Sequence, residues 1–180
     1  MSNLSLPQNS SEVLLRPVAI PETELERYIS FKHALNLRFP DEDTGDWHFQ
    51  PYFFEQTDSL KTQKSIPLAG KEQPVDTTPS LGHQGVRDMS SILSQERLPI
   101  PSDQPVYVAN HYRAIADLAM LDLQKSRVPS IADNAAINGW LDSQEQVAHL
   151  KRDYLERLAI QLSGEPLRIF KQWIQTVKFI

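Results

Sequence analysis

The chain has 180 residues, of which 40% are hydrophobic and 23% are charged. This length and composition are typical of one globular domain, or of one domain with a small lobe, and exclude collagen-like and disordered chains. The absence of cysteine excludes disulfides, thiolate metal sites and thiol nucleophiles. The formal net charge of −5 argues against a dedicated nucleic-acid binder, because such proteins gain affinity from lysine and arginine.

Residues 1–20 lack the basic start and the apolar stretch of a secretory signal. No later apolar run reaches the roughly 18 residues that a membrane-spanning helix needs. The sequence therefore predicts a cytoplasmic protein without membrane association, which also fits the lack of cysteine.

The N-terminal region, residues 1–56, is predicted to contain strands and one helix. Apolar residues within 12–20 favour a short pair of strands. A proline and two acidic residues then mark a helix start, and a helix is predicted over 22–39. The aromatic-rich segment 46–54 favours a strand.

The middle of the chain, residues 57–85, is mostly polar and contains several proline and glycine breakers, so a loop or linker is predicted there. A short helix is predicted within 86–98. Residues 86–180 as a whole are expected to form a helical region that packs with the N-terminal region as one domain.

A short strand over 106–108 is predicted to lead into a helix that Asn110 caps and that extends to Leu123. This helix is apolar over most of its circumference, which predicts that it is buried. Arg113 and Asp117 lie four residues apart on it, and a charge on an apolar helix needs a partner. We therefore predict a structural ion pair between them.

Apolar residues at helical spacing predict a helix over 143–162, with Ser143 and Gln146 as a capping box. Gly164 can end this helix, and a second one continues from Pro166 towards the C-terminus. Together with the N-terminal elements, these helices predict an α+β fold. Its C-terminal half is helix-rich, and a small sheet comes mainly from the N-terminal half.

Acidic and aromatic residues are concentrated between the predicted helix and the end of the predicted aromatic strand. Residues 1–58 carry ten acidic and four basic side chains, and the densest aromatic cluster of the chain lies in the same stretch. Aromatic side chains dominate interface hot spots, and carboxylates complement a basic partner. The candidate partner-binding residues are Asp41, Glu42, Asp43, Asp46, Trp47, Phe49 and Phe53.

The same acidic turn supports an alternative, because closely spaced carboxylates and an imidazole can bind a hard metal or perform acid–base chemistry. Asp43, Asp46 and His48 would then serve a small metal-dependent hydrolase or transferase. The turn departs from a calcium loop, since Gly45 stands one place early and Tyr52 replaces the bidentate glutamate. No glycine-rich phosphate loop or nucleophile elbow occurs either, so the leading interpretation has no catalytic residue, metal or cofactor.

The segment from Val106 to Leu118 resembles a short stretch of the antitoxins that accompany bacterial nucleotidyltransferase-type toxins in abortive-infection gene pairs. In those antitoxins an extended piece leads into a helix with an Arg-Ala-x-x-Asp-Leu core. The residues that match this core are Arg113, Ala114, Asp117 and Leu118. The resemblance covers about thirteen of the 180 residues.

The resemblance implies a protein partner. The expected function is a non-catalytic protein-binding protein, an antitoxin that neutralises a toxin enzyme by direct binding, and the acidic front part predicts that this enzyme is basic. The usual plan of these antitoxins includes an N-terminal winged helix-turn-helix, which residues 1–60 do not show. The sequence leaves the identity of the partner and the oligomeric state open.

Overall fold

The computed structural model describes residues 14–40, 42, 48–57, 64–101, 104–130, 137 and 139–179. These residues form an α+β fold, as the sequence predicts, and its strands are arranged in one two-stranded and one four-stranded sheet. The strands are β1 (Leu15–Pro17), β2 (Arg27–Ile29), β3 (Phe54–Gln56), β4 (Leu68–Gly70), β5 (Val86–Asp88) and β6 (Tyr107–Ala109).

The helices of the N-terminal and middle parts are short. They are α1 (Phe31–Leu35), α2 (Phe49–Phe53), α3 (Thr78–Leu81) and α4 (Ser90–Gln95). The longer helical segments follow in the C-terminal half. They are α5 (His111–Leu123), α7 (Gln144–His149) with its π-helical continuation η2 (Leu150–Leu155) and 3-10 continuation η3 (Glu156–Gln161), and α8 (Gly164–Trp173).

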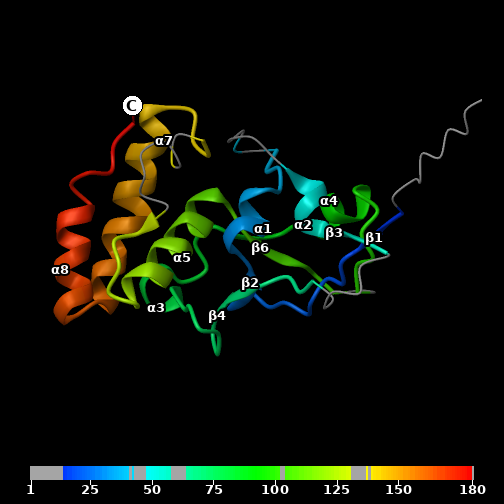
Figure 1. The fold of residues 1–180 in the computed structure, drawn as a ribbon, viewed down its shortest axis with the longest axis horizontal. Helices are drawn as coiled ribbons and strands as arrows, with labels where there is room; N and C mark the ends of the chain where they lie inside the picture. The colour runs from blue at the N-terminus through cyan, green and yellow to red at the C-terminus, as the bar shows by residue number, and fades with distance from the viewer. Residues whose placement is uncertain are drawn as a thin grey trace, which may run out of the picture.

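The four-stranded sheet has the order β4-β2-β6-β5. Its central pair, β2 and β6, is parallel with Ile29 opposite Val108, whereas both outer pairs are antiparallel. Antiparallel β1 and β3 form a separate small sheet, which lies at the far end of the molecule from α8 (Figure 1).

Helix α5 is the central helix of the fold. It follows β6 directly, and Asn110 caps it by accepting a hydrogen bond from the backbone N–H of Arg113 at 2.9 Å. It contacts α1, β6, η2 and α8, so that the sheet elements and the C-terminal helices share it (Figure 1). The predicted buried helix is thus confirmed, and burial on nearly all sides explains its largely apolar sequence.

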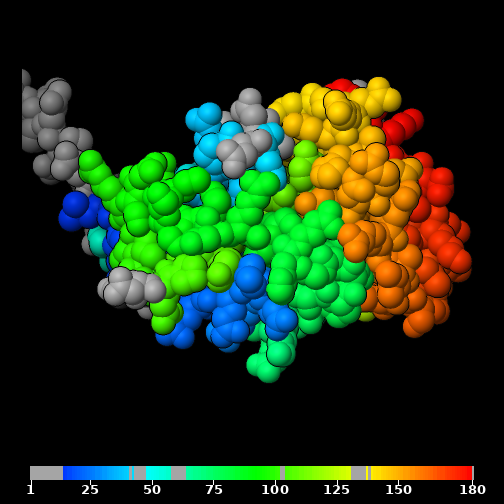
Figure 2. All heavy atoms as spheres, turned by 180° about the vertical axis from the view of Figure 1, so that it is seen from behind, coloured from blue at the N-terminus to red at the C-terminus, as the bar shows by residue number. Residues whose placement is uncertain are grey.

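The C-terminal helices form one end of the molecule, seen in orange and red in Figure 2. The predicted capping of the first of them is confirmed: Ser143 Oγ accepts a hydrogen bond from the Gln146 N–H at 3.1 Å. The Gln146 side chain in turn accepts from the Asp142 N–H, one residue before the expected position. Among the described residues, no helix combines the length and apolar character needed to cross a bilayer.

Two N-terminal predictions are wrong. The helix predicted over 22–39 is replaced by strand β2 and the short helix α1, because Tyr28 and Ile29 are both buried in the sheet and pair with β4 and β6. In the described part of the aromatic segment predicted as a strand over 46–54, residues Phe49–Phe53 form helix α2, and the extended β3 only begins at Phe54. Tertiary packing outweighs local propensity in both segments.

The segment predicted as a loop or linker, residues 57–85, differs as well in its described part. It supplies β4 to the four-stranded sheet and then the short helix α3. Ala69, Val75 and Leu81 from this segment lie in the hydrophobic core. The proline and glycine breakers therefore mark the ends of short packed elements and the turns between them.

Gly70 ends β4 with φ of +104°, and a Cβ atom there would lie 2.0 Å from the carbonyl oxygen of Glu26. Gly82 also has a positive φ, but nothing lies within 4 Å of its Cβ position. We expect Gly82→Ala to cost about 1–3 kcal/mol through backbone strain alone, and Gly70→Ala to cost clearly more because rigid backbone must move. Urea unfolding of both variants measures the difference; equal costs would contradict the close approach at Gly70.

Candidate functional site

The predicted ion pair between Arg113 and Asp117 is present on α5, with 3.6 Å between Arg113 Nε and Asp117 Oδ1. Both side chains are 0% exposed. Burying two charges is costly unless further hydrogen bonds satisfy them, so their other partners decide whether the arrangement is stable.

Three hydroxyl groups meet the Asp117 carboxylate. Ser30 Oγ donates to Oδ2 at 2.6 Å, Thr77 Oγ1 donates to Oδ1 at 2.5 Å, and the Tyr28 hydroxyl lies 3.4 Å from Oδ1. Tyr28 is the middle residue of β2, Ser30 directly follows that strand, and Thr77 directly precedes α3. The carboxylate therefore joins α5 to two other parts of the chain.

Arg113 extends the network in the opposite direction. Its Nε donates to the Tyr28 hydroxyl at 2.9 Å, and its Nη1 donates to the carbonyl oxygens of Gly82 and Gln84 at 3.0 and 2.8 Å. The guanidinium carbon also lies 5.0 Å from the centre of the Tyr28 ring, a cation–π distance.

Burial raises the pKa of Asp117, while Arg113 and the hydroxyl donors oppose this rise. Burial, together with the Asp117 charge, also raises the pKa of Tyr28, so the phenol keeps its proton and remains a donor. Because these groups lie away from the surface, we assign the network a structural role in positioning its neighbours.

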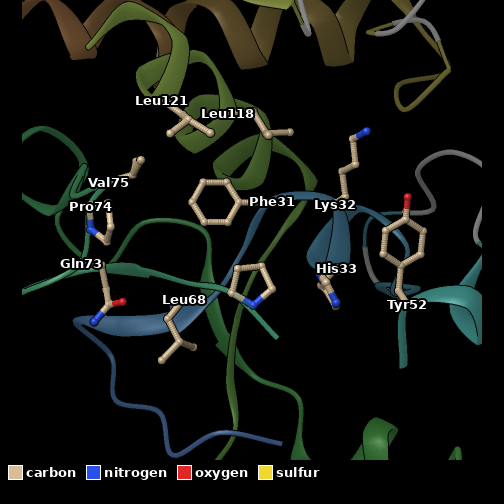
Figure 3. A pocket seen from close by; sticks show the side chains of 11 residues that line it. Phe31, Lys32, His33, Tyr52, Leu68, Gln73, Pro74, Val75, Leu118 and Leu121 are labelled. Atoms are coloured by element: carbon tan, nitrogen blue, oxygen red, sulfur yellow. The ribbon is translucent and has the colours of Figure 1, made fainter. Parts of the chain in front are cut away.

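An apolar pocket of about 610 Å³ lies beside this network. Figure 3 shows the ring of the lining residue Phe31 between Leu118 and Leu121 of α5 on one side and Leu68 of β4 on the other. The lining residues are Phe31, Lys32, His33, Tyr52, Pro67, Leu68, Gln73, Pro74, Val75, Leu118 and Leu121. Its volume and apolar lining are typical of small-ligand sites.

Three of the lining residues lie within two positions, in the sequence, of a residue of the buried network. Phe31 follows Ser30, Leu118 follows Asp117, and Val75 precedes Thr77 by two residues. The hydrogen bonds from Ser30 and Thr77 to the carboxylate therefore set the spacing of these walls.

Phe31 has a φ of +58°, a left-handed conformation that bulky residues rarely adopt. Such strain costs of the order of 1–3 kcal/mol and persists only where the surrounding structure imposes it. The preceding Ser30 is fixed by Asp117, and Phe31 itself is the first residue of α1. The strained turn directs the aromatic ring into the pocket, as Figure 3 shows.

His33 lies at the side of the pocket formed by α1 and α2. Its ring meets Tyr52 and Phe53 edge-on, with centroid distances of 5.3 and 5.7 Å. Burial lowers the pKa of His33 to about 4, and the nearby Lys64 charge also lowers it. The imidazole is therefore neutral at pH 7.

Three of the predicted partner-binding residues lie within the described part of the chain. Glu42 is 11% exposed, and its Oε1 accepts from Arg87 Nη2 at 2.7 Å and from Asn110 Nδ2 at 2.8 Å. Phe49 is half-buried and stacks on Phe53 with a centroid distance of 4.6 Å.

Phe53 is 0% exposed, so its proposed role as a partner-contacting anchor is corrected to a core residue that holds α2 in place. Tyr52, its neighbour on α2, is the half-buried aromatic residue of this helix that faces the pocket. The remaining predicted residues, Asp41, Asp43, Asp46 and Trp47, lie outside the described residues.

The alternative metal site is not decided by these positions. His48 is exposed, and its backbone N–H donates to Asn36 Oδ1 at 2.9 Å. Within the described ranges, no group of three or more histidine or acidic side chains is close enough to hold a metal ion. Asp43 and Asp46 are outside those ranges, and the metal-dependent enzyme stays a hypothesis.

Sequence reasoning did not find the pocket. Its lining comes from segments that are distant in sequence, and the left-handed turn at Phe31 has no residue-type signature. Leu118 and Leu121 are the half-buried apolar residues of α5 that line the pocket, but the sequence does not distinguish them from the buried apolar residues of the same helix.

Comparison of the chain with protein-family models, with curated proteins and with solved structures found no match. The candidate sites are therefore defined by geometry: a strained apolar pocket beside α1, and half-buried aromatic side chains on α2.

Replacing Asp117 by Leu leaves Arg113 as a buried, unpaired charge, and we expect this to cost about 3–5 kcal/mol of folding free energy. The double replacement Arg113→Met with Asp117→Leu should recover a large part of that loss, because it removes the charge itself. The control is Asp122→Leu on the same helix, where loss of the hydrogen bonds to Ser130 should cost about 1 kcal/mol. Equal costs at both aspartates, measured by urea unfolding, would refute the importance of the network.

The neutral His33 makes folding dependent on pH. In the unfolded chain the imidazole takes up a proton near pH 6.5, whereas in the folded protein it does so only near pH 4. The stability that depends on the neutral ring is therefore complete above pH 6.5 and is lost as the pH falls towards 4. Allowing for solvent screening of a half-buried group, this loss should be about 1–2 kcal/mol.

The variant His33→Gln keeps an N–H donor but does not titrate, so its free energy of unfolding should fall less between pH 7 and pH 4 than that of the native chain. His48→Gln, at an exposed position, is the matched control and should follow the native pH profile. Parallel profiles for the native chain and His33→Gln would show that His33 is not responsible.

Proposed function

We propose that this chain is a non-catalytic protein-binding protein, an antitoxin that neutralises a partner toxin enzyme by direct binding. The match of Arg113, Ala114, Asp117 and Leu118 to the Arg-Ala-x-x-Asp-Leu core of such antitoxins supports the proposal. In this chain Arg113 and Asp117 are buried, so the Arg-Ala-x-x-Asp-Leu motif would act as a structural element that positions the binding surfaces.

The observation that carries the proposal is the aromatic face of α2. Phe49 and Tyr52 are half-buried at the surface, while Phe53 anchors the same helix in the core. Rigidly held aromatic side chains with one exposed face lose little conformational entropy on binding, which is why they dominate interface hot spots.

Acidic residues precede this aromatic face in the chain. Glu42 is held by Arg87 and Asn110, which fixes one point of the acidic segment to the body of the protein. Residues 1–58 carry ten acidic and four basic side chains, a balance that attracts a basic partner and accelerates its association. An acidic segment that is followed in the sequence by half-buried aromatic side chains suits a partner with a basic groove and an apolar floor.

The test begins with purification of the tagged chain from its native host at low salt, and identification by mass spectrometry of a basic protein that co-purifies in a fixed ratio. Binding of that partner is then measured for the native chain and for Asp41→Lys/Asp43→Lys/Asp46→Lys. We expect the triple variant to bind about tenfold more weakly at low salt, with most of the salt dependence lost.

The matched control is Glu145→Lys/Glu156→Lys/Glu165→Lys, which makes the same charge change at exposed positions of the C-terminal helices and should leave binding within about twofold. Phe49→Ala should weaken binding at least about fivefold if α2 is the apolar anchor. Unchanged affinity of the acidic-segment variant at low salt would contradict the electrostatic part of the proposal.

A further inference from the structure

The apolar pocket has one positive charge at its mouth. Lys32 is exposed, follows the strained Phe31, and forms no ion pair with any carboxylate of the described residues. The other polar side chains that line the pocket, among the described residues, are His33, Tyr52 and Gln73, and none of them carries a carboxylate. The local charge of the pocket is therefore opposite in sign to the net charge of the chain.

A second ammonium group, that of Lys64, lies behind this side of the pocket. Lys64 Nζ donates to the carbonyl oxygens of Pro51 at 2.9 Å and Phe54 at 3.4 Å, at the end of α2. Its charge is near enough to His33 to lower the pKa of that imidazole. Lys64 does not line the pocket, so Lys32 is the cation that a ligand in the pocket would meet.

The interior is suited to an apolar body. Phe31, Leu118 and Leu68 surround the space in Figure 3, and Val75 and Pro74 close the side opposite Lys32. A volume of about 610 Å³ is large enough for a small organic molecule. The strained backbone at Phe31 is a second feature typical of a binding site, because strained residues cluster where proteins hold ligands.

We propose that this pocket binds a small amphipathic carboxylic acid, with its acyl or aryl body between Phe31, Leu68 and Leu118 and its carboxylate at the ammonium group of Lys32. A carboxylate suits this position because it pairs with a cation and remains in water at the mouth, while the apolar body leaves water. The proposal does not rest on the proposed antitoxin function, since it concerns the isolated chain and a different ligand.

Calorimetric titration with decanoate, below its micelle concentration, and with the uncharged decan-1-ol separates the two contributions. Burial of the alkyl chain of each probe should let both probes bind, and the carboxylate should make decanoate bind about three- to tenfold more tightly than decan-1-ol. Equal affinity for the two probes, or no binding of either, would overturn the proposal.

Lys32→Met should abolish the preference for decanoate, whereas Lys32→Arg should retain it. Both changes are at an exposed position and should leave the fold intact. Lys171→Met, at an exposed position of α8, is the matched control and should keep the native preference. A preference that survives Lys32→Met would show that the carboxylate binds elsewhere and would refute the assignment.

The position of the apolar body is tested by filling the pocket. Gln73→Trp places a large ring at the lining and should weaken binding of both probes at least about tenfold, while Gln172→Trp on α8 should have no effect. Thermal unfolding of each variant confirms that it is folded. Failure of the partner-binding experiment would leave these results unaffected, so the two proposals fail separately.

Discussion

The fold depends on one buried carboxylate. Asp117 accepts hydrogen bonds from Ser30 and Thr77 and is paired with Arg113, which itself holds the carbonyl oxygens of Gly82 and Gln84. A carboxylate with no access to water requires all of these partners, because each unsatisfied group would cost about 1–3 kcal/mol. That requirement holds the end of β2, helix α3 and the loop after it against α5, and so brings together short elements that have little stability of their own.

The same constraint positions the surface features. Because Ser30 is hydrogen-bonded to Asp117, the backbone turns at Phe31, which has a left-handed conformation. The ring of Phe31 then points into the pocket. Phe31 is the first residue of α1, and His33 of the same helix packs against Tyr52 and Phe53 of α2. The pocket and the aromatic face of α2 are therefore neighbours on one framework, with a basic mouth at the first and an acidic segment before the second.

The elements that could be predicted from the sequence are those that local information specifies. Helix α5 is predicted by the Asn110 cap and by its apolar residues. Helix α7 is predicted by the helical spacing of its apolar residues and by the Ser143 cap. Strand β2 could not be found in this way, because Tyr28 is extended only by virtue of pairing with a segment some forty residues later. The Arg113–Asp117 pair followed from spacing, but its hydroxyl partners come from distant positions and carry no pattern.

Native-state hydrogen exchange of the native chain and of Asp117→Asn tests this account most directly. The account predicts that backbone amides in β2, α3 and α5 open with a shared free energy, and that the substitution lowers protection in all three elements together. Loss of protection confined to α5, with β2 and α3 unchanged, would contradict the claim that the buried carboxylate holds the framework of both sites.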